Sequence, residues 1–188
     1  MRLPPFILLL ALAGCAREEA APPPPTGRSA TADDTQTRPL GEADAARVEL
    51  LPVGGSGVRG TARLVRYDAG VRVELRAEGL DEGLHGVAVL EAAACAEADA
   101  SGHFDPSGAP HGDPEDPRPL HHAGDLGNVR ASEGGARMDR IFTDVRLDGP
   151  TSVVGRVLVV HEGQDDLNTQ PDGGAGAPVA CGVVEPVE

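Results

Sequence analysis

The stretch 71-VRVELRA-77 alternates between apolar and charged side chains. Positions 71, 73, 75 and 77 share one face and positions 72, 74 and 76 the other, which is the period of a β-strand with one buried face. No part of the chain shows a helical period. Similar short runs, separated by turn signals such as 148-DGP-150, recur at residues 48–53, 58–67, 86–91, 138–147, 152–161 and 179–184.

The composition indicates an aliphatic core. The 188 residues include no Trp, one Tyr and three Phe, so Val, Leu, Ile and Ala must fill the interior. Short strands bounded by turns predict an all-β sandwich or barrel of Greek-key type. The intervening segments 92–137 and 162–178 are too long for simple connectors, and we expect them to be functional loops.

The first of these loops carries a possible metal site. His103, His111, His122 and Asp125 follow one another at separations of eight, eleven and three residues. Three imidazoles and a carboxylate would complete a zinc tetrahedron, and a closed site of this kind is structural, since a hydrolase needs an open position for water. The alternative is a surface loop with scattered histidines.

The N-terminus predicts export. Residues 6–12 form an apolar run after Arg2 that is too short to span a bilayer, so residues 1–14 are expected to be a signal peptide. The run 12-LAGC-15 resembles the lipobox of bacterial lipoproteins, which implies acylation of Cys15; ordinary cleavage nearby is the alternative. Residues 15–45 would then be a disordered Pro/Ala-rich tether, and residues 46–188 one domain.

Charge and cysteine usage limit the partners and the compartment. The net charge is −14, and about −15 once Arg2 is removed with the signal peptide, which argues against nucleic acid as a partner. If Cys15 carries lipid, the remaining cysteines, Cys95 and Cys181, form a pair in an oxidising compartment. They would be either a disulfide or two buried thiols.

Several motifs together resemble copper/zinc superoxide dismutases. The match runs in order along the domain from about residue 48 to 184, and 165-DDL-167 with 169-TQP-171 is similar to the bacterial branch. The resemblance implies an eight-stranded Greek-key β-barrel with two long functional loops, a Cys95–Cys181 disulfide and zinc at the four loop ligands. The motifs are 83-GLHG-86, 102-GHFDP-106, 111-HG-112, 122-HAGDLGNV-129, 159-VVHE-162 and 180-ACGV-183.

The resemblance also points to a degenerate copper site. In the family, the histidine at the position of His103 bridges zinc and copper, that of His161 binds copper, and the aspartate at Asp165 hydrogen-bonds ligands of both metals. Two further copper-ligand histidines and an arginine that docks superoxide are missing. Their positions hold Ala88, Leu90 and Pro178.

The other histidines have different expected roles. The family uses the position of His85 structurally, and we expect a hydrogen-bonded core histidine there. His121 is expected to face solvent. His161 is interpreted as a remnant copper ligand, with a weak second metal site or a hydrogen bond to His103 as alternatives.

The sequence thus predicts a zinc-stabilised, non-catalytic lipoprotein of the bacterial cell envelope, held to a membrane through Cys15 and facing the periplasm. Ala16 is not the aspartate associated with inner-membrane retention, which slightly favours the outer membrane. The alternative is a low-activity dismutase with copper held by His103, His161 and an unrecognised ligand such as Glu91 or His85. A homodimer and the identity of a protein partner are left open.

Overall fold

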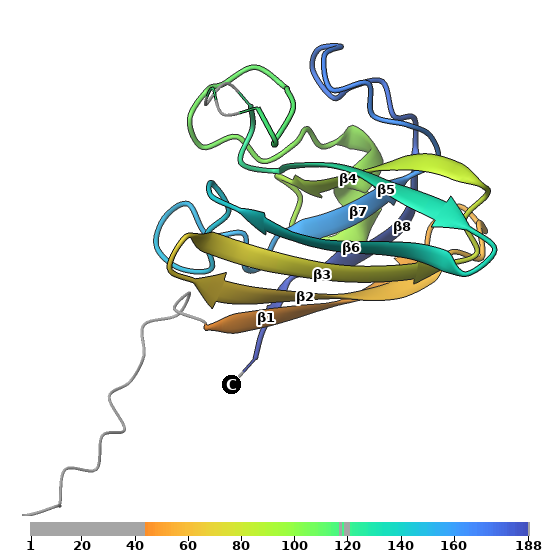
Figure 1. The fold of residues 1–188 in the computed structure, drawn as a ribbon, viewed down its shortest axis with the longest axis horizontal. Coiled ribbons are helices and arrows are strands. Elements are labelled where there is room, and N and C mark those ends of the chain that lie inside the picture. Colours follow the sequence, from red (N-terminus) through yellow and green to blue (C-terminus); the bar gives the residue numbers. More distant parts are fainter. Residues whose placement is uncertain (1–43, 117, 119–120, 188) are drawn as a thin grey trace, which may run out of the picture. The chain divides into compact units, whose positions relative to one another are not determined.

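Eight antiparallel strands close into a barrel (Figure 1), as the sequence predicts. The computed structural model describes residues 44–116, 118 and 121–187. A two-residue strand, β9 (Glu185–Pro186), extends the sheet at β1. The barrel strands are β1 (Ala45–Pro52), β2 (Arg59–Tyr67), β3 (Gly70–Glu78), β4 (Gly83–Leu90), β5 (Asp125–Ser132), β6 (Gly135–Phe142), β7 (Val157–His161) and β8 (Pro178–Val183).

The strand order is that of a Greek key. The neighbours run β2, β3, β6, β5, β4, β7, β8 and β1, and pairing of β1 with β2 closes the ring. In this ring β4 lies opposite β2, and β7 lies opposite β3. The barrel therefore has one wall made of β1, β2, β3 and β6 and another made of β5, β4, β7 and β8.

The alternation in 71–77 has the predicted effect. In β3 the residues Val71, Val73, Leu75 and Ala77 are buried in the barrel, while the charged residues between them face outward. The interior is filled with aliphatic side chains, and Phe104, Phe142 and Met138 are the larger members of the same core. Burial of these apolar side chains is the main force that closes the barrel.

The predicted extent of the first loop is wrong. Residues 125–132 form β5, and β6 begins at Gly135, so the loop covers only residues 91–124. Small residues such as Ala131 and Ser132, together with Gly127 at a positive φ of 70°, weakened the alternation in the sequence. The predicted strands 138–147 and 152–161 were also too long, because residues 143–156 form a connection.

Strand β4 holds both ends of this loop. The amide of Phe104 donates to the carbonyl of Val89 (2.8 Å), and the amide of Val89 donates to that of Gly124 (2.8 Å). A short 3₁₀ helix, η1 (Cys95–Ala100), follows β4, and a disulfide joins Cys95 to Cys181 in β8, as expected. The loop therefore returns to the same strand from which it departs.

The first described strand begins at Ala45, next to the predicted domain boundary at residue 46. The predicted signal peptide, Cys15 and nearly all of the predicted tether lie outside the described residues. Within the described part of the chain, no helix is long and apolar enough to cross a membrane.

Candidate metal centre

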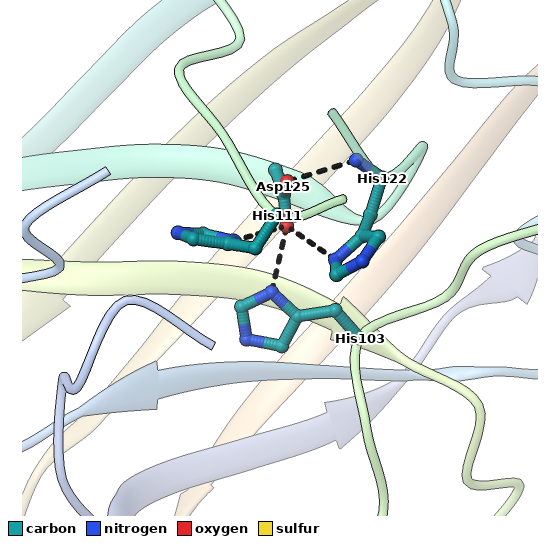
Figure 2. A group of neighbouring side chains, drawn as sticks. All are labelled: His103, His111, His122 and Asp125. Carbon is teal, nitrogen blue, oxygen red and sulfur yellow. Dashed lines mark hydrogen bonds and ion pairs between the residues drawn. The ribbon is translucent and has the colours of Figure 1, made fainter. Parts of the chain in front are cut away.

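The structure brings together the four ligands predicted from the sequence. His103, His111, His122 and Asp125 are all buried, and one ligand atom from each lies within 4.8 Å of the others. Figure 2 shows the three imidazoles arranged around the carboxylate of Asp125. Its Oδ1 atom lies 2.7 Å from Nδ1 of His103, 3.0 Å from Nδ1 of His111 and 3.2 Å from Nδ1 of His122.

Backbone groups fix the orientation of Asp125. Its Oδ2 accepts hydrogen bonds from the amides of Gly112 (3.0 Å) and His122 (2.9 Å). Burial alone would raise the pKa of Asp125, yet its bonds to His103 and His111 hold that pKa well below the usual range. The carboxylate is thus a fixed negative charge at the first residue of β5.

These four residues fit a zinc ion. A tetrahedral zinc with bonds of about 2.0 Å places its ligands about 3.3 Å apart, close to the separations around Asp125. All three rings present the same nitrogen, Nδ1, toward one point. Four protein ligands would leave no coordination position for water, so zinc bound here would supply structural crosslinks and no hydrolytic chemistry.

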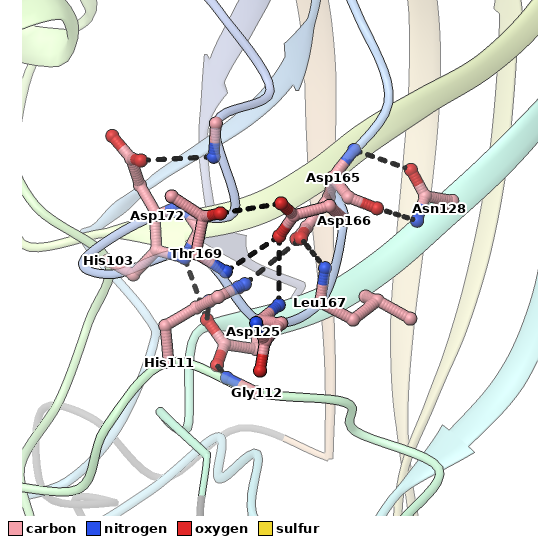
Figure 3. Close-up of polar contacts among 12 residues, drawn as sticks. His103, His111, Gly112, Asp125, Asn128, Asp165, Asp166, Leu167, Thr169 and Asp172 are labelled. Carbon is pink, nitrogen blue, oxygen red and sulfur yellow. Dashed lines mark hydrogen bonds and ion pairs between the residues drawn. The ribbon is translucent and has the colours of Figure 1, made fainter.

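Asp165 forms a second layer behind this cluster (Figure 3). Its Oδ1 lies 3.0 Å from Nε2 of His111 and accepts a bond from the amide of Leu167 (2.7 Å). Asn128 holds the backbone of Asp165 on both sides, through bonds of 2.9 Å and 2.8 Å. A carboxylate bonded to the far nitrogen of a metal-ligating imidazole fixes the ring and raises its basicity.

The pKa of His111 reflects this double contact. Burial lowers it, but the bonds to Asp125 and Asp165 outweigh burial and raise it to about 10 in the metal-free cluster. A metal at Nδ1 must therefore displace a proton. Gly173 packs directly over this pair at a φ of 71°, and a Cβ atom there would collide with Asp165 and His111.

Gln170 joins the two long loops. Its side chain accepts from the amide of His111 (2.9 Å) and donates to the carbonyl of His111 (2.8 Å). Gln170 and Asn128 lie in the motifs 169-TQP-171 and 122-HAGDLGNV-129, but no role was predicted for either residue. Their roles follow from hydrogen bonds to His111 and Asp165, which lie far from them in the sequence. The spacing of residues along the chain does not predict such contacts.

The other side of His103 is apolar. Ala88 and Leu90 are buried with Val157, Val159 and Cys181 in a small hydrophobic cluster. Pro178 is buried at the start of β8, where it pairs with His161. None of the three side chains at positions 88, 90 and 178 offers a donor atom to a metal.

Two ring nitrogens in this region have no partner. Nε2 of His103 and Nε2 of His161 are buried, and neither forms a hydrogen bond within the described part of the chain. Nδ1 of His161 lies 2.7 Å from the carbonyl of Gly176, and burial lowers the pKa of this ring. The ring centroids of His103 and His161 are 6.1 Å apart.

The residues around Nε2 of His103 do not fit a redox copper ion. Two imidazole nitrogens and three apolar side chains give too few ligands to fix the geometry of a redox copper. Asp165 was predicted to bond to ligands of both metals, and its Oδ1 lies 3.0 Å from Nε2 of His111. Among the described residues it forms no bond to a copper-side ligand.

The remaining histidines show one expected and one unexpected position. His85 is buried, and its ring nitrogens lie 3.0 Å and 2.9 Å from the carbonyls of His161 and Asp81, which agrees with a structural role. The prediction for His121 was wrong. Its side chain is only 8% exposed, and its Nε2 lies 3.2 Å from the carboxylate of Asp144 in the 143–156 connection.

Comparisons with known proteins agree with the geometry. The family model described as copper/zinc superoxide dismutase matches residues 58–184. A superoxide dismutase [Cu-Zn] A of Xenopus laevis is 41% identical over 140 residues, which cover 69% of this chain and 91% of the relative. An extracellular superoxide dismutase [Cu-Zn] of Brugia pahangi is 35% identical over 152 residues, covering 74% and 75%.

A solved structure has the same fold. The crystal structure of the clock protein EA4 superposes with a TM-score of 0.68 at 31% identity. The match covers 77% of this chain and 96% of that protein.

Proposed function

The chain belongs to the copper/zinc superoxide dismutase family, and we propose that it is an envelope lipoprotein that binds zinc structurally and has lost copper-dependent superoxide dismutation. The zinc part of this proposal rests on the convergence of His103, His111, His122 and Asp125. The loss of dismutation rests on the apolar cluster around Ala88 and Leu90.

The observation that carries the proposal is the contrast on either side of His103. Its Nδ1 lies among the ligand atoms of His111, His122 and Asp125. On its Nε2 side, the one other buried side-chain atom without a hydrogen-bond partner among the described residues is Nε2 of His161. Dismutation needs a metal that cycles between two oxidation states in a fixed coordination geometry. It also benefits from a cation that attracts superoxide, and Pro178 carries no charge.

A second candidate function has one observation in its favour. The unpartnered Nε2 atoms of His103 and His161 could hold copper weakly, because a metal about 2 Å from two imidazole nitrogens places the ring centroids roughly 6 Å apart. A dismutase that uses this remnant site would have low activity.

Metal analysis separates the two candidates. We expect the purified protein, loaded with both metals and dialysed, to contain about one zinc per chain and little copper. Stopped-flow measurement of superoxide decay should give no rate above that of free-ion controls. Tightly held copper near one per chain, with metal-dependent turnover, would establish the remnant-site dismutase instead.

Restoring the missing ligands gives a positive control. The double variant Ala88→His/Leu90→His should bind about one copper per chain, because four imidazoles would then surround the site. Ala88→Gln/Leu90→Gln is the matched control, since it loosens the same apolar cluster without adding a strong copper ligand. If the histidine variant retains no more copper than the glutamine variant, the copper site has changed beyond these two positions.

Two observations support the proposal that the protein is exported to the cell envelope. The Brugia pahangi relative is named as extracellular, and the Cys95–Cys181 bridge is typical of proteins from oxidising compartments. Acylation of Cys15 rests on the lipobox resemblance. Mass spectrometry of the mature N-terminus tests it: a diacylglyceryl-modified Cys15 is the expected result, and a free N-terminus elsewhere would remove the anchor from the proposal.

A further inference from the structure

We propose that the outer face of β1, β2, β3 and β6 is a docking surface for a bilayer that contains anionic lipid. This docking face consists of the outward-pointing side chains of the four strands. The inference rests on the proposed lipid anchor, which would hold the domain beside a membrane. Its test uses the chain without that anchor, so that the two can fail separately.

Exposed apolar side chains lie at both ends of this face. The exposed large hydrophobic residues among the described ones are Leu51 (55%), Tyr67 (46%), Ile141 (49%) and Val187 (45%). Three of them point outward from β1, β2 and β6, and the amide of the fourth bonds to Ala45 at the edge of β1. Tyrosine beside aliphatic side chains is typical of residues at the interface of a membrane with water.

The docking face also has a positive balance of charge in a strongly acidic protein. Its outward positions hold six arginines and four carboxylates, whereas the other described residues hold six arginines and twenty carboxylates. The six arginines of the face are Arg47, Arg59, Arg63, Arg72, Arg76 and Arg137. An anionic surface would therefore attract this face and repel the rest of the domain.

The arrangement of these arginines is unfavourable for the sheet itself. Arg76 lies directly opposite Arg137, and Arg47 lies directly opposite Arg63. Like charges in such cross-strand pairs destabilise a sheet. Glu185 contacts Arg47, and Asp139 contacts Arg72, but the side chains of Arg59, Arg63, Arg76 and Arg137 have no hydrogen-bond or ion-pair partner among the described residues. Anionic headgroups would supply the missing partners.

The position of the face in the barrel suits docking. The tether predicted to follow Cys15 leads into β1, which is one strand of this wall. Strands β2 and β3 lie opposite β4 and β7 in the ring. Strands β4 and β5, which contribute to the metal centre, belong to the other wall (Figure 1), so docking through this face would leave them free of the bilayer.

The test uses the predicted mature chain, from residue 15 onward, with Cys15→Ala, so that neither the apolar signal peptide nor an acyl group can bind the vesicles. Sedimentation with vesicles of phosphatidylcholine, and of an equal mixture of phosphatidylcholine and phosphatidylglycerol, measures the partition coefficient. We expect binding to the mixed vesicles alone, weakened by salt. Tyr67 is the one tyrosine and the chain has no tryptophan, so protection of tyrosine fluorescence from acrylamide reports contact at this face.

Matched charge reversals identify the surface. Arg76→Glu should weaken partitioning by about tenfold or more, because the change replaces a charge attracted to the anionic surface with one that is repelled. The same change also removes a like-charge pair, so folding should be preserved. Arg118→Glu is the control for total charge and should have less than about a threefold effect. No binding to mixed vesicles, or equal effects of the two reversals, would overturn the proposal whatever the state of Cys15.

Discussion

The two sides of His103 share one backbone frame but differ in chemistry. Ala88 pairs with the zinc ligand Asp125, and Leu90 pairs with His103 itself. On the side proposed to bind zinc, the zinc half, four buried ligand atoms converge; on the side proposed to have lost copper, the copper half, Ala88 and Leu90 pack in a hydrophobic cluster separate from the barrel core. Under our proposal, strand pairing has been retained while one of two adjoining metal sites has been replaced by a packed cluster.

Of the changes considered, removal of zinc should lower the stability of the domain most. The loop 91–124 has few apolar residues, so zinc is expected to be its main organiser, and a ligand present at about a thousand times its dissociation constant stabilises by about 4 kcal/mol. We expect chelation to lower the thermal midpoint by about 10 °C or more. Calorimetry with and without chelator checks this, and an unchanged midpoint would show that the zinc half does not depend on metal.

Breaking the disulfide should loosen the copper half selectively. Cys181 belongs to the apolar cluster of Ala88 and Leu90, and the bridge closes 86 residues. The double variant Cys95→Ser/Cys181→Ser should lose about 2–4 kcal/mol of unfolding free energy in denaturant titrations. Zinc content should remain near one per chain. Loss of zinc in the folded variant would mean that the two halves are coupled.

Leu90→Ala tests whether the copper half is now core. Leu90 is only 1% exposed, and deletion of a buried leucine side chain costs about 2–4 kcal/mol through lost burial and a cavity. Denaturant unfolding at constant zinc measures the change. The exposed Leu51→Ala is the control and should cost less than about 0.5 kcal/mol. Similar losses for both variants would contradict the description of this region as packed core.

The zinc half depends on its second layer. Asp165→Ala removes the acceptor at Nε2 of His111 and should weaken zinc binding by about tenfold to a hundredfold. Competition with a zinc chelator measures the affinity. Asp166→Ala is a nearby control, since Asp166 caps Thr169 and its carboxylate has no hydrogen bond to a ligand among the described residues. Equal losses would assign the effect to the loop as a whole.

Zinc affinity should also depend on pH. The pKa of His111 is raised from 6.5 to about 10 without metal, so its contribution to metal-free stability is complete below pH 6.5 and disappears as the pH rises through 10. Zinc must displace this proton, and affinity should rise up to about tenfold per pH unit between 7 and 9. Calorimetric titration in buffers of different ionisation enthalpy measures the released proton. If zinc binding released no proton, His111 would be neutral before zinc binds.

The sequence predicted the fold better than the details of the metal region. Alternation in residues 71–77 and the spacing from His103 to Asp125 were sufficient for the strand class and for the cluster, because both are local patterns. Strand β5 was missed because Gly127 and Ala131 weaken its period. The contact of His121 with Asp144 and the role of Gln170 depend on segments that meet only in the folded chain, and no local signal encodes such meetings.

The bridge between Cys95 and Cys181 has a consequence for the order of maturation. Every polar side chain of the metal region, from His103 to Asp165, lies within the covalent ring that this bond closes. When the barrel unfolds, the four ligands remain within one disulfide-closed loop. The closed loop limits how far apart they can move and so raises their effective concentration. Oxidation before metal uptake would therefore preassemble the chelate. If zinc bound before the disulfide formed, the same four ligands would have to come together in an unfolded chain without a crosslink.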